Sequence, residues 1–461
     1  MTTQSTFRTD SPALLTDRYE LTMVQAALRD GTADRRCVFE VFTRRLPPGR
    51  RYGVVAGTGR VLEELARFRF TTAELDWLAD ERVVDDPTLR FLADFRFTGD
   101  VVGYAEGEVF FPQSPLLVVE GTFAQAVLLE TLVLSILNYD SAVASAASRM
   151  TSAALDRPCL EMGSRRAQER AGVAAARAAV VGGFAGTSNL EAGRTYGLAT
   201  IGTAAHAFTL LHDDERAAFA AQVAALGTGT TLLVDTYDVR AGVATALEVA
   251  GPGLGAVRLD SGDLGVLAHE VRAQLDAAGA PGVRITVTSD LDEYAIAALA
   301  VAPVDSYGVG TSVVTGSGAP TCGMVYKLVA REDASGAMRP VAKASTAKTS
   351  VGGRKSAARR TVDGRDVEEV LVTGPDERVR AVSASPDAAR AAFAADDGPG
   401  ELRPLHVPLV VGGEIDDRWT GAVGVRTAAE RHLASRAELP RGARRLSADE
   451  AAVPTVTLAI V

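Results

Sequence analysis

Residues 255–310 read GAVRLDSGDLGVLAHEVRAQLDAAGAPGVRITVTSDLDEYAIAALAVAPVDSYGVG. Three short runs with β-branched residues, GAVRLD, RITVTSD and VDSYGVG, alternate with stretches in which apolar residues recur every three or four positions. Such alternation is typical of strand–helix–strand units whose strands lie parallel in one sheet. The stretch therefore predicts an α/β fold.

The same alternation begins near Pro158 and continues to about Ala330. Its earlier part contains the runs AAVVGGF (178–184), LATIGTA (198–204) and TTLLVDTY (230–237), each of which we expect to be a strand. Both a (β/α) barrel and an open doubly wound sheet produce this periodicity. In either fold, ligands bind where the carboxyl ends of the strands meet.

The regions on both sides of this repeat have a different pattern. FEVFTRRLPPGRRYGVVAG (39–57) predicts a strand, a turn and a second strand. Near the other end, VEEVLVT (367–373) and PLHVPLVV (404–411) predict strands, and TAAERHLASR (427–436) predicts a closing helix. A basic, loop-rich stretch, KASTAKTSVGGRKSAARR (343–360), connects them to the repeat.

The composition is that of a globular protein. Hydrophobic residues make up 47% of the chain, charged residues make up 23%, and the net charge of −10 disfavours nucleic acid and anionic membranes as partners. The polar start MTTQSTFRTDS lacks the features of a secretory signal, and the apolar stretch 124–147 is interrupted by Glu130 and Asp140, which predicts a buried helix. We therefore expect a cytoplasmic protein. Three widely spaced cysteines form no disulfide or zinc pattern: Cys37, Cys159 and Cys322.

Polar residues or glycines follow most of the predicted strands. In a barrel these positions converge on one face and could bind one ligand. They are Ser188 and Asn189, His206, Asp235, Arg258, Asp290 and Gly310.

His206 lies among small residues in GTAAHAF, where little bulk separates its ring from a ligand. Taken alone, a histidine at a strand end is more often structural than catalytic. His212 and His432 lie in surface-like sequence, and His269 and His406 have no visible polar partners, so we interpret them as structural.

The segment RLDSGDL places Arg258, Asp260 and Asp263 around a turn that begins a helix. The arginine could bind an anion and the acids could bind a metal. An internal ion pair with a helix N-cap at Ser261 explains the same residues equally well.

Two further segments could bind phosphate or a carboxylate. GVGTS supplies Gly310 and Thr311 at a helix start, an arrangement that suits phosphate, although glycine turns are common. Arg165 and Arg166 follow a strand end in GSRRAQER, and at least one of them could simply be solvated.

Taken together, the segments resemble the nicotinate phosphoribosyltransferase family. The matching segments occur in order from residue 14 to about 330 and become less similar after Lys343. They are LLTDRYELTM, FEVFTRRLPPGRRYGVVAG, ETLVLSILNYDS, EMGSRRAQ, GGFAGTSN, GTAAHAF, VDTYDV, RLDSGDL and GVGTSVVT.

This resemblance implies an irregular (β/α) barrel with an α/β sandwich domain built from the N-terminal and C-terminal segments. We place the sandwich in residues 1–125 and 341–461 and the barrel-like catalytic domain in residues 126–340. The implied enzyme is a homodimer with an active site shared across the interface. It condenses nicotinate with 5-phosphoribosyl 1-pyrophosphate to nicotinate mononucleotide and pyrophosphate, with Mg²⁺ and with coupled ATP hydrolysis.

The resemblance also assigns roles to individual residues. His206 matches the family's phosphorylated histidine, and Tyr19 matches an aromatic residue that stacks on the pyridine ring from the other subunit. Contacts with the nicotinate carboxylate or the sugar phosphate are implied for Arg165, Thr203 and Arg258. Acids near the ribose and Mg²⁺ are matched by Asp235, Asp260 and Asp263, the last two as catalytic residues, and the phosphate loop is matched by Gly310 and Thr311. No residue is assigned as a direct metal ligand.

Two positions bear on the choice of substrate. Ser188 resembles the position at which the related nicotinamide enzyme has an aspartate, and a neutral serine would not repel an acid substrate, which favours nicotinate. Met162 stands where several relatives have a phenylalanine against the pyridine ring. Methionine can still pack on an aromatic face, or it could be ordinary core packing.

Other functions remain open at this point. One is a non-catalytic phosphosugar- or nucleotide-binding relative, and another is an enzyme that accepts nicotinamide. A sugar-phosphate aldolase or isomerase would use a lysine or another base at a strand end, and no lysine lies between Thr16 and Tyr326.

Overall fold

The structure is a computed structural model that describes residues 11–343, 351–394 and 396–460. It divides into two compact units: unit 1 comprises Met1–Ala142 and Thr321–Val461, and unit 2 comprises Val143–Pro320. The N-terminal and C-terminal segments thus share unit 1. The units divide after residues 142 and 320, whereas the limits expected from the sequence lie after residues 125 and 340. Most of the polar start and part of the basic stretch after Lys343 lie outside the described residues.

Unit 2 contains a six-stranded parallel sheet with the order β7-β6-β11-β10-β9-β8. The first strand of the unit, β6, pairs with the last, β11. In the described part of the chain, no hydrogen-bonded pairing joins β7 to β8 at the two edges of the sheet. The predicted α/β class is confirmed. The strands are β6 (Cys159–Glu161), β7 (Gly186–Thr187), β8 (Thr231–Leu233), β9 (Ala256–Leu259), β10 (Arg284–Ser289) and β11 (Ser306–Val309).

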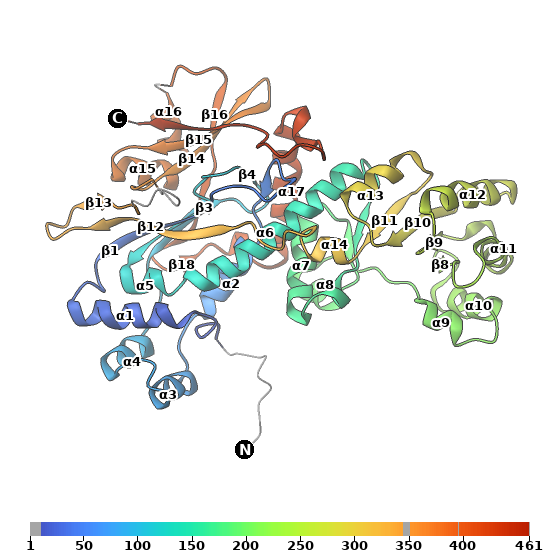
Figure 1. The fold of residues 1–461 in the computed structure, drawn as a ribbon, viewed down its shortest axis with the longest axis horizontal. Helices are drawn as coiled ribbons and strands as arrows, with labels where there is room; N and C mark the ends of the chain where they lie inside the picture. The colour runs from blue at the N-terminus through green and yellow to red at the C-terminus, as the bar shows by residue number, and fades with distance from the viewer. Residues whose placement is uncertain (1–10, 344–350, 395, 461) are drawn as a thin grey trace. The chain divides into compact units, whose positions relative to one another are not determined.

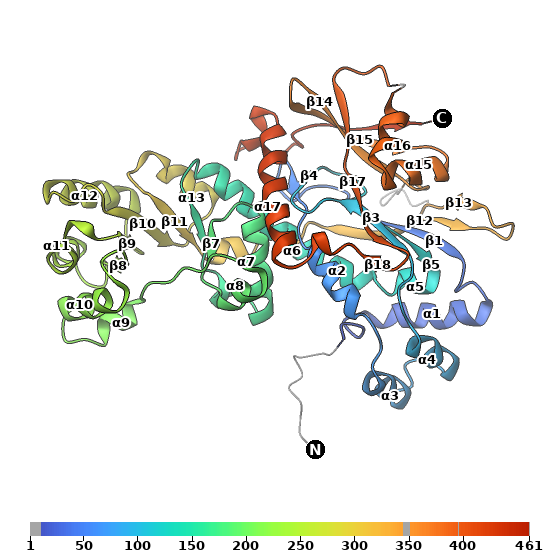
Figure 2. The same cartoon turned by 180° about the vertical axis from the view of Figure 1, so that it is seen from behind.

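Helices lie around these strands, as Figures 1 and 2 show. Several begin with an acidic N-cap that satisfies a free backbone N–H, as Asp214 does for the helix after it. The helices are α7 (Glu169–Val181), α8 (Leu190–Tyr196), α9 (His206–Leu210), α10 (Glu215–Leu226), α11 (Val239–Ala250), α12 (Leu264–Ala277), α13 (Glu293–Ala298) and α14 (Thr311–Val314).

Two of the predicted strands in unit 2 are wrong. Most of the run 178–184 continues helix α7, because alanine favours the helix, which ends only at Gly182 and Gly183. The run 198–204 forms one isolated bridge, between Thr200 and Thr187. Gly197, in the left-handed conformation, ends α8 directly before this run, and Gly202 lies within it.

Unit 1 is built on a seven-stranded sheet with the order β13-β12-β1-β5-β3-β17-β18, whose described pairings are antiparallel. It combines β1 (Arg36–Thr43), β3 (Asp100–Tyr104) and β5 (Leu117–Thr122) with the later strands β12 (Met324–Glu332), β13 (Met338–Pro340), β17 (His406–Val411) and β18 (Glu414–Ile415). A second, four-stranded sheet contains β14 (Ser356–Val362), β15 (Arg365–Thr373), β16 (Glu401–Pro404) and β19 (Thr455–Ala459), and β2 (Gly53–Val54) pairs with β4 (Val109–Phe110).

Apart from the last of them, the helices of unit 1 contribute to one large apolar core against the seven-stranded sheet or to a smaller one against the four-stranded sheet. They are α1 (Arg18–Asp30), α2 (Thr58–Arg67), α3 (Thr72–Asp80), α4 (Asp86–Ala93), α5 (Phe123–Val127), α15 (Asp376–Ala384), α16 (Pro386–Phe393) and α17 (Gly421–Glu438). His432, expected at the surface, is fully buried in α17, where its Nδ1 lies 3.2 Å from the Gly107 carbonyl.

Helix α6 (Glu130–Ala153) contains the limit between the two units. Together with α5 it forms an apolar segment, Phe123–Ala153, that is long enough to cross a membrane, with a mean hydropathy of 1.4 in its most apolar window. Because 67% of that window is buried inside the protein, the segment has the character of a core helix, as predicted.

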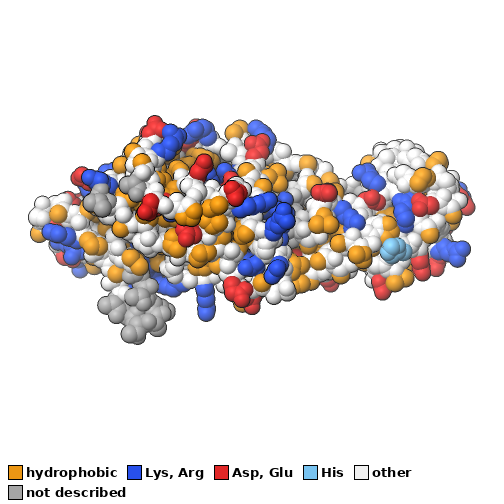
Figure 3. Space-filling view, turned by 90° about the horizontal axis from the view of Figure 1, so that it is seen from above, with side chains coloured by type: hydrophobic (Ala, Val, Ile, Leu, Met, Phe, Trp, Pro, Cys, Tyr) orange, Lys and Arg blue, Asp and Glu red, His pale blue; other side chains and the backbone are white. Residues whose placement is uncertain are grey.

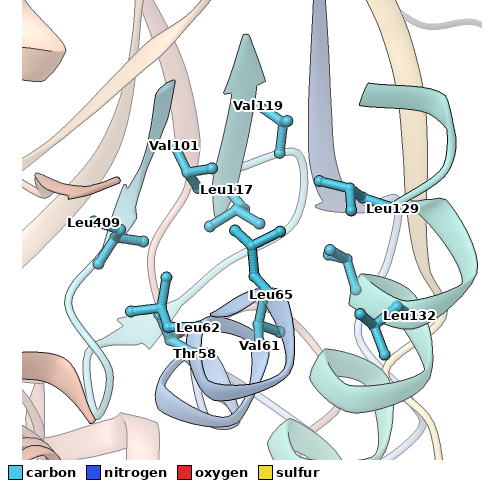
Figure 4. Close-up of a pocket in the computed structure, with 11 residues that line it drawn as sticks. Thr58, Val61, Leu62, Leu65, Val101, Leu117, Val119, Leu129, Leu132 and Leu409 are labelled. Atoms are coloured by element: carbon cyan, nitrogen blue, oxygen red, sulfur yellow. The ribbon is translucent and has the colours of Figure 1, made fainter. Parts of the chain in front are cut away.

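A pocket in unit 1 is lined by aliphatic side chains together with Thr58 and has no charged lining residue (Figure 4). None of the predicted site residues is among its lining residues, which are Thr58, Val61, Leu62, Leu65, Val101, Leu117, Val119, Leu129, Leu132, Val133 and Leu409. On the molecular face in Figure 3, basic and acidic side chains are interspersed. Because the pocket has no charged lining residue, it is no candidate for binding a phosphate.

Candidate active site

Two acids meet where neighbouring strands of unit 2 end. Asp235 follows β8 and Asp260 follows β9, and parallel pairing brings the carboxyl ends of both strands to the same edge. Asp235, with 2% of its side chain exposed, accepts hydrogen bonds at Oδ2 from the Asp260 backbone N–H (2.8 Å) and the Ser261 hydroxyl (2.8 Å). The hydroxyl of Thr288, in β10, donates to Oδ1 of Asp260. Three adjacent strands therefore fix the two carboxylates.

His206 faces this acid pair from the start of α9. Its Nδ1 lies 3.1 Å from the Thr236 hydroxyl oxygen, and its Nε2 lies 3.9 Å from Oδ1 of Asp235 and 3.9 Å from Oδ2 of Asp260. These two distances are too long for hydrogen bonds, but they place both carboxylates beside the same ring nitrogen. The fold therefore places polar side chains beside His206 that are absent from its own segment GTAAHAF.

Arg258, in β9, donates from Nη1 to the Thr203 hydroxyl at 3.1 Å. Burial lowers the pKa of this guanidinium, the nearby charges of Asp260 and Asp235 raise it, and the charge of Arg165 lowers it. Among the described residues, Arg258 has no carboxylate within ion-pair distance, and its Nε is buried without a hydrogen-bond partner. The arginine can therefore bind an anionic group.

Two further strands, β6 and β7, lie at the opposite end of the sheet from β8 and β9. Met162 and Arg165 follow β6, and Ser188 follows β7. Arg165 is exposed in a short 3₁₀ turn, Ser164–Arg166, and Ser188 donates its backbone N–H to the Glu161 carbonyl at 2.8 Å. Met162 packs against Gly308 of β11, where an added Cβ would lie 2.8 Å from the methionine sulfur. The partly exposed thioether thus lies over a strand that has no side chain at that point.

The remaining predicted residues have simpler positions. Asp263 is exposed and caps α12, because its Oδ1 accepts the Val266 N–H at 3.1 Å, so the cap is Asp263 and not Ser261. Gly310 and Thr311 mark the start of α14, directly after β11. In the described chain, Asp263 is not among the groups that contact His206, Asp235 or Asp260.

Sequence reasoning missed three residues of this site: Thr236, Thr288 and Glu215. Thr236 adjoins Asp235 in VDTYD, and Thr288 ends the run RITVTS, so proximity to strand ends could have indicated both. Glu215 begins α10; burial, Asp235 and Asp238 together raise its pKa to about 7. The acids in DDERAAF indicate only a helix start, and no local pattern shows that Glu215 lies near Asp235.

The acid pair suits a hard cation. Oδ1 of Asp235 is buried and lacks a hydrogen-bond partner among the described residues, and Asp260 is 39% exposed. Mg²⁺ typically takes one or two carboxylates and completes its shell with water and substrate phosphates. No group of three or more His, Cys, Asp or Glu side chains in the described chain is arranged to hold a metal, so such an ion would need ligands from a substrate.

Known proteins resemble this chain over most of its length. A family model described as the nicotinate phosphoribosyltransferase (NAPRTase) N-terminal domain matches residues 14–138. A nicotinate phosphoribosyltransferase of Mycobacterium tuberculosis is 61% identical over 371 residues, which cover 79% of this chain and 81% of that protein. The chain belongs to the nicotinate phosphoribosyltransferase family.

The chain is also similar to other members of the nicotinate phosphoribosyltransferase family. The Bacillus subtilis nicotinate phosphoribosyltransferase is 39% identical over 71% of this chain and 68% of that protein. The crystal structure of human nicotinic acid phosphoribosyltransferase matches with a TM-score of 0.80 at 27% identity, over 96% of this chain and 97% of that one. The chain is therefore a phosphoribosyltransferase enzyme.

Within the family match, Tyr19 lies in α1 of unit 1, whereas the other predicted site residues lie in unit 2. Its side chain is 45% exposed. Burial, followed by the charges of Glu130 and Glu20, raises its pKa to about 12. The phenol is thus neutral at physiological pH and presents an uncharged ring.

Proposed function

We propose that this enzyme condenses nicotinate with 5-phosphoribosyl 1-pyrophosphate to nicotinate mononucleotide and pyrophosphate, and that phosphorylation of His206 couples the reaction to ATP hydrolysis. The main support is the position of His206 opposite Asp235 and Asp260, at 3.9 Å from each. Membership in the nicotinate phosphoribosyltransferase family agrees with this choice of substrates.

The residue types suit the proposed chemistry. Attack by the pyridine nitrogen on C1 of the ribose builds positive charge on the sugar, which carboxylates such as Asp235 and Asp260 would stabilise. Arg258 and Arg165 would bind the substrate's anionic groups, because a guanidinium matches a carboxylate or phosphate with two parallel hydrogen bonds. A neutral Ser188 would not repel the carboxylate of nicotinate.

Mg²⁺, when bound, would neutralise charge on the pyrophosphate leaving group. Asp235 and Asp260 are the residues that would hold it. A phosphate on His206 would add negative charge beside the same acids, so ATP hydrolysis would alter how strongly this end of the site attracts a cation. We further propose that the protein acts as a cytoplasmic homodimer in which Tyr19 of one subunit stacks on the pyridine ring in the other.

The test uses the purified protein with nicotinate, 5-phosphoribosyl 1-pyrophosphate, ATP and Mg²⁺. Nicotinate mononucleotide should form, and mass spectrometry should detect an acid-labile phosphate on His206. The His206→Ala variant should lose the ATP dependence, whereas His269→Ala, on α12, should retain it. Saturable binding without product would instead favour a non-catalytic relative, and faster turnover of nicotinamide would favour the nicotinamide reaction.

A further inference from the structure

Glu161 is a fully buried carboxylate at the carboxyl end of β6, between β7 and β11. Oε1 accepts the backbone N–H of Gly163, and Oε2 accepts the hydroxyl of Thr187 at 2.5 Å. Burial raises the pKa of Glu161, and these hydrogen bonds from Thr187 and Gly163 lower it. In the described chain, both hydrogen-bond donors to this carboxylate are uncharged. Burying a carboxylate without a cation is costly, so the position of Glu161 needs an explanation.

The two partners of Glu161 belong to different loops. Gly163 opens the turn that contains Arg165, and Thr187 directly precedes Ser188. The backbone reinforces this connection, because Ser188 N–H donates to the Glu161 carbonyl at 2.8 Å. One residue therefore contacts both loops through three separate oxygens.

The packing around this carboxylate leaves no space for a side chain at Gly163. A Cβ at position 163 would lie 3.0 Å from Oε1 of Glu161 and 2.2 Å from a methyl carbon of Val314. Asn189 adds a second connection, because its backbone N–H donates to the Thr187 hydroxyl oxygen at 2.9 Å and its Nδ2 donates to the Ser164 hydroxyl oxygen at 2.9 Å. The loops are held in one arrangement by directional hydrogen bonds.

We propose that Glu161 is a positioning residue for the end of the site that binds the pyridine carboxylate: its two carboxylate oxygens fix the Arg165 loop relative to the Ser188 loop. This inference rests on the proposed function, in which Arg165 and Ser188 face the acid substrate. A carboxylate suits this role because it offers two acceptor oxygens, whereas an amide of the same shape offers one.

The Glu161→Gln variant keeps the shape and removes one acceptor. Loss of one buried hydrogen bond corresponds to about a tenfold rise in KM for nicotinate. The KM for 5-phosphoribosyl 1-pyrophosphate and kcat should change by no more than about twofold, because loops after other strands are left intact. Thr187→Val should reproduce this selective rise, and Thr187→Ser, which retains the hydroxyl, should restore wild-type behaviour.

Thr151→Val is the matched control. It removes another buried threonine hydroxyl of unit 2, which donates to the Ala147 carbonyl at 3.0 Å within α6. It should leave KM for nicotinate unchanged even if it lowers the melting temperature. An equal rise in both KM values for Glu161→Gln, or a similar rise for Thr151→Val, would indicate a merely structural role and overturn the inference.

Calorimetric titration of nicotinate separates this inference from the proposed function. If the wild-type protein binds nicotinate without turning it over, the proposed reaction is wrong, and weaker nicotinate binding by Glu161→Gln would still support the positioning role. Equal affinity of wild type and variant would refute that role. A wild-type protein that neither binds nor converts nicotinate would refute both.

Discussion

Arg359 in unit 1 and Arg258 in unit 2 are two arginines in strands with opposite surroundings. Arg359 is fully buried and donates to Glu369 at 2.6 Å, to Asp366 at 3.1 Å and to the Val109 carbonyl at 2.9 Å. Arg258 donates to the Thr203 hydroxyl and has no ion pair among the described residues. The first arginine has its charge neutralised within the fold, and the second retains charge that a ligand can neutralise.

The largest expected effect is on stability in unit 1. Arg359→Met would leave Glu369 and Asp366 buried without their cation, which costs about 3 to 5 kcal/mol of unfolding free energy. Urea unfolding measures this loss. The control, Arg390→Met, removes an exposed arginine whose pair with Asp387 lies on α16, and it should cost less than about 1 kcal/mol. Similar losses in the two variants would contradict the comparison.

The second prediction concerns Arg258→Met. Because no carboxylate of the described residues lies within ion-pair distance of Arg258, the unfolding free energy should change by less than about 1 kcal/mol. Turnover should instead fall by about a hundredfold, since removing a charged contact in a partly buried site costs about 3 kcal/mol of binding or activation energy. Arg284→Met, at the amino end of neighbouring β10, should stay within about twofold of wild type. A stable, fully active Arg258→Met protein would rule out the assigned role.

A third prediction concerns two buried histidines of unit 1. Burial lowers the pKa of His406 to about 4 and that of His432 to about 3. Below about pH 6.5 the unfolded chain therefore binds protons that the folded chain does not, and stability falls as the pH falls, by about 1.4 kcal/mol per pH unit for each histidine. Burial also raises the pKa of Glu215 to about 7 and that of Asp366 to about 6, and these two carboxyls have the opposite effect on stability in this range. Each histidine's share is therefore measured as a difference: below about pH 6 the unfolding free energy of the wild type should fall by about 1.4 kcal/mol per pH unit more than that of His406→Gln.

The smallest effect is expected at Thr236. Thr236→Val removes the hydroxyl that lies 3.1 Å from Nδ1 of His206 and should lower ATP-coupled turnover by about fivefold, the value of one hydrogen bond of about 1 kcal/mol. Thr236→Ser keeps the hydroxyl and should restore the rate. Phosphorylation of His206 measured over time would separate this effect from product release. An unchanged phosphorylation rate in Thr236→Val would show that the contact is incidental.

Much of the fold could be predicted from periodicity. Strands β8 to β11 coincide with predicted runs, because each combines β-branched residues with a polar end. The strand prediction for residues 178–184 is wrong because the alanines of this run favour a helix as much as its valines favour a strand. The surface position predicted for His432 is wrong for another reason. Its helix is buried by segments distant in sequence, including Gly107, and no local pattern shows this burial.

By itself, the sequence determined the α/β class, the family and the positions that follow the strands, because these depend on local periodicity and on the order of motifs along the chain. The tertiary structure decided which of these positions meet. It brought His206, Asp235 and Asp260 together, left Asp263 as a helix cap and gave Glu161 two loops to hold. The physical reason is that parallel pairing aligns the ends of strands distant in sequence, and only that alignment fixes the distances over which charges and hydrogen bonds act.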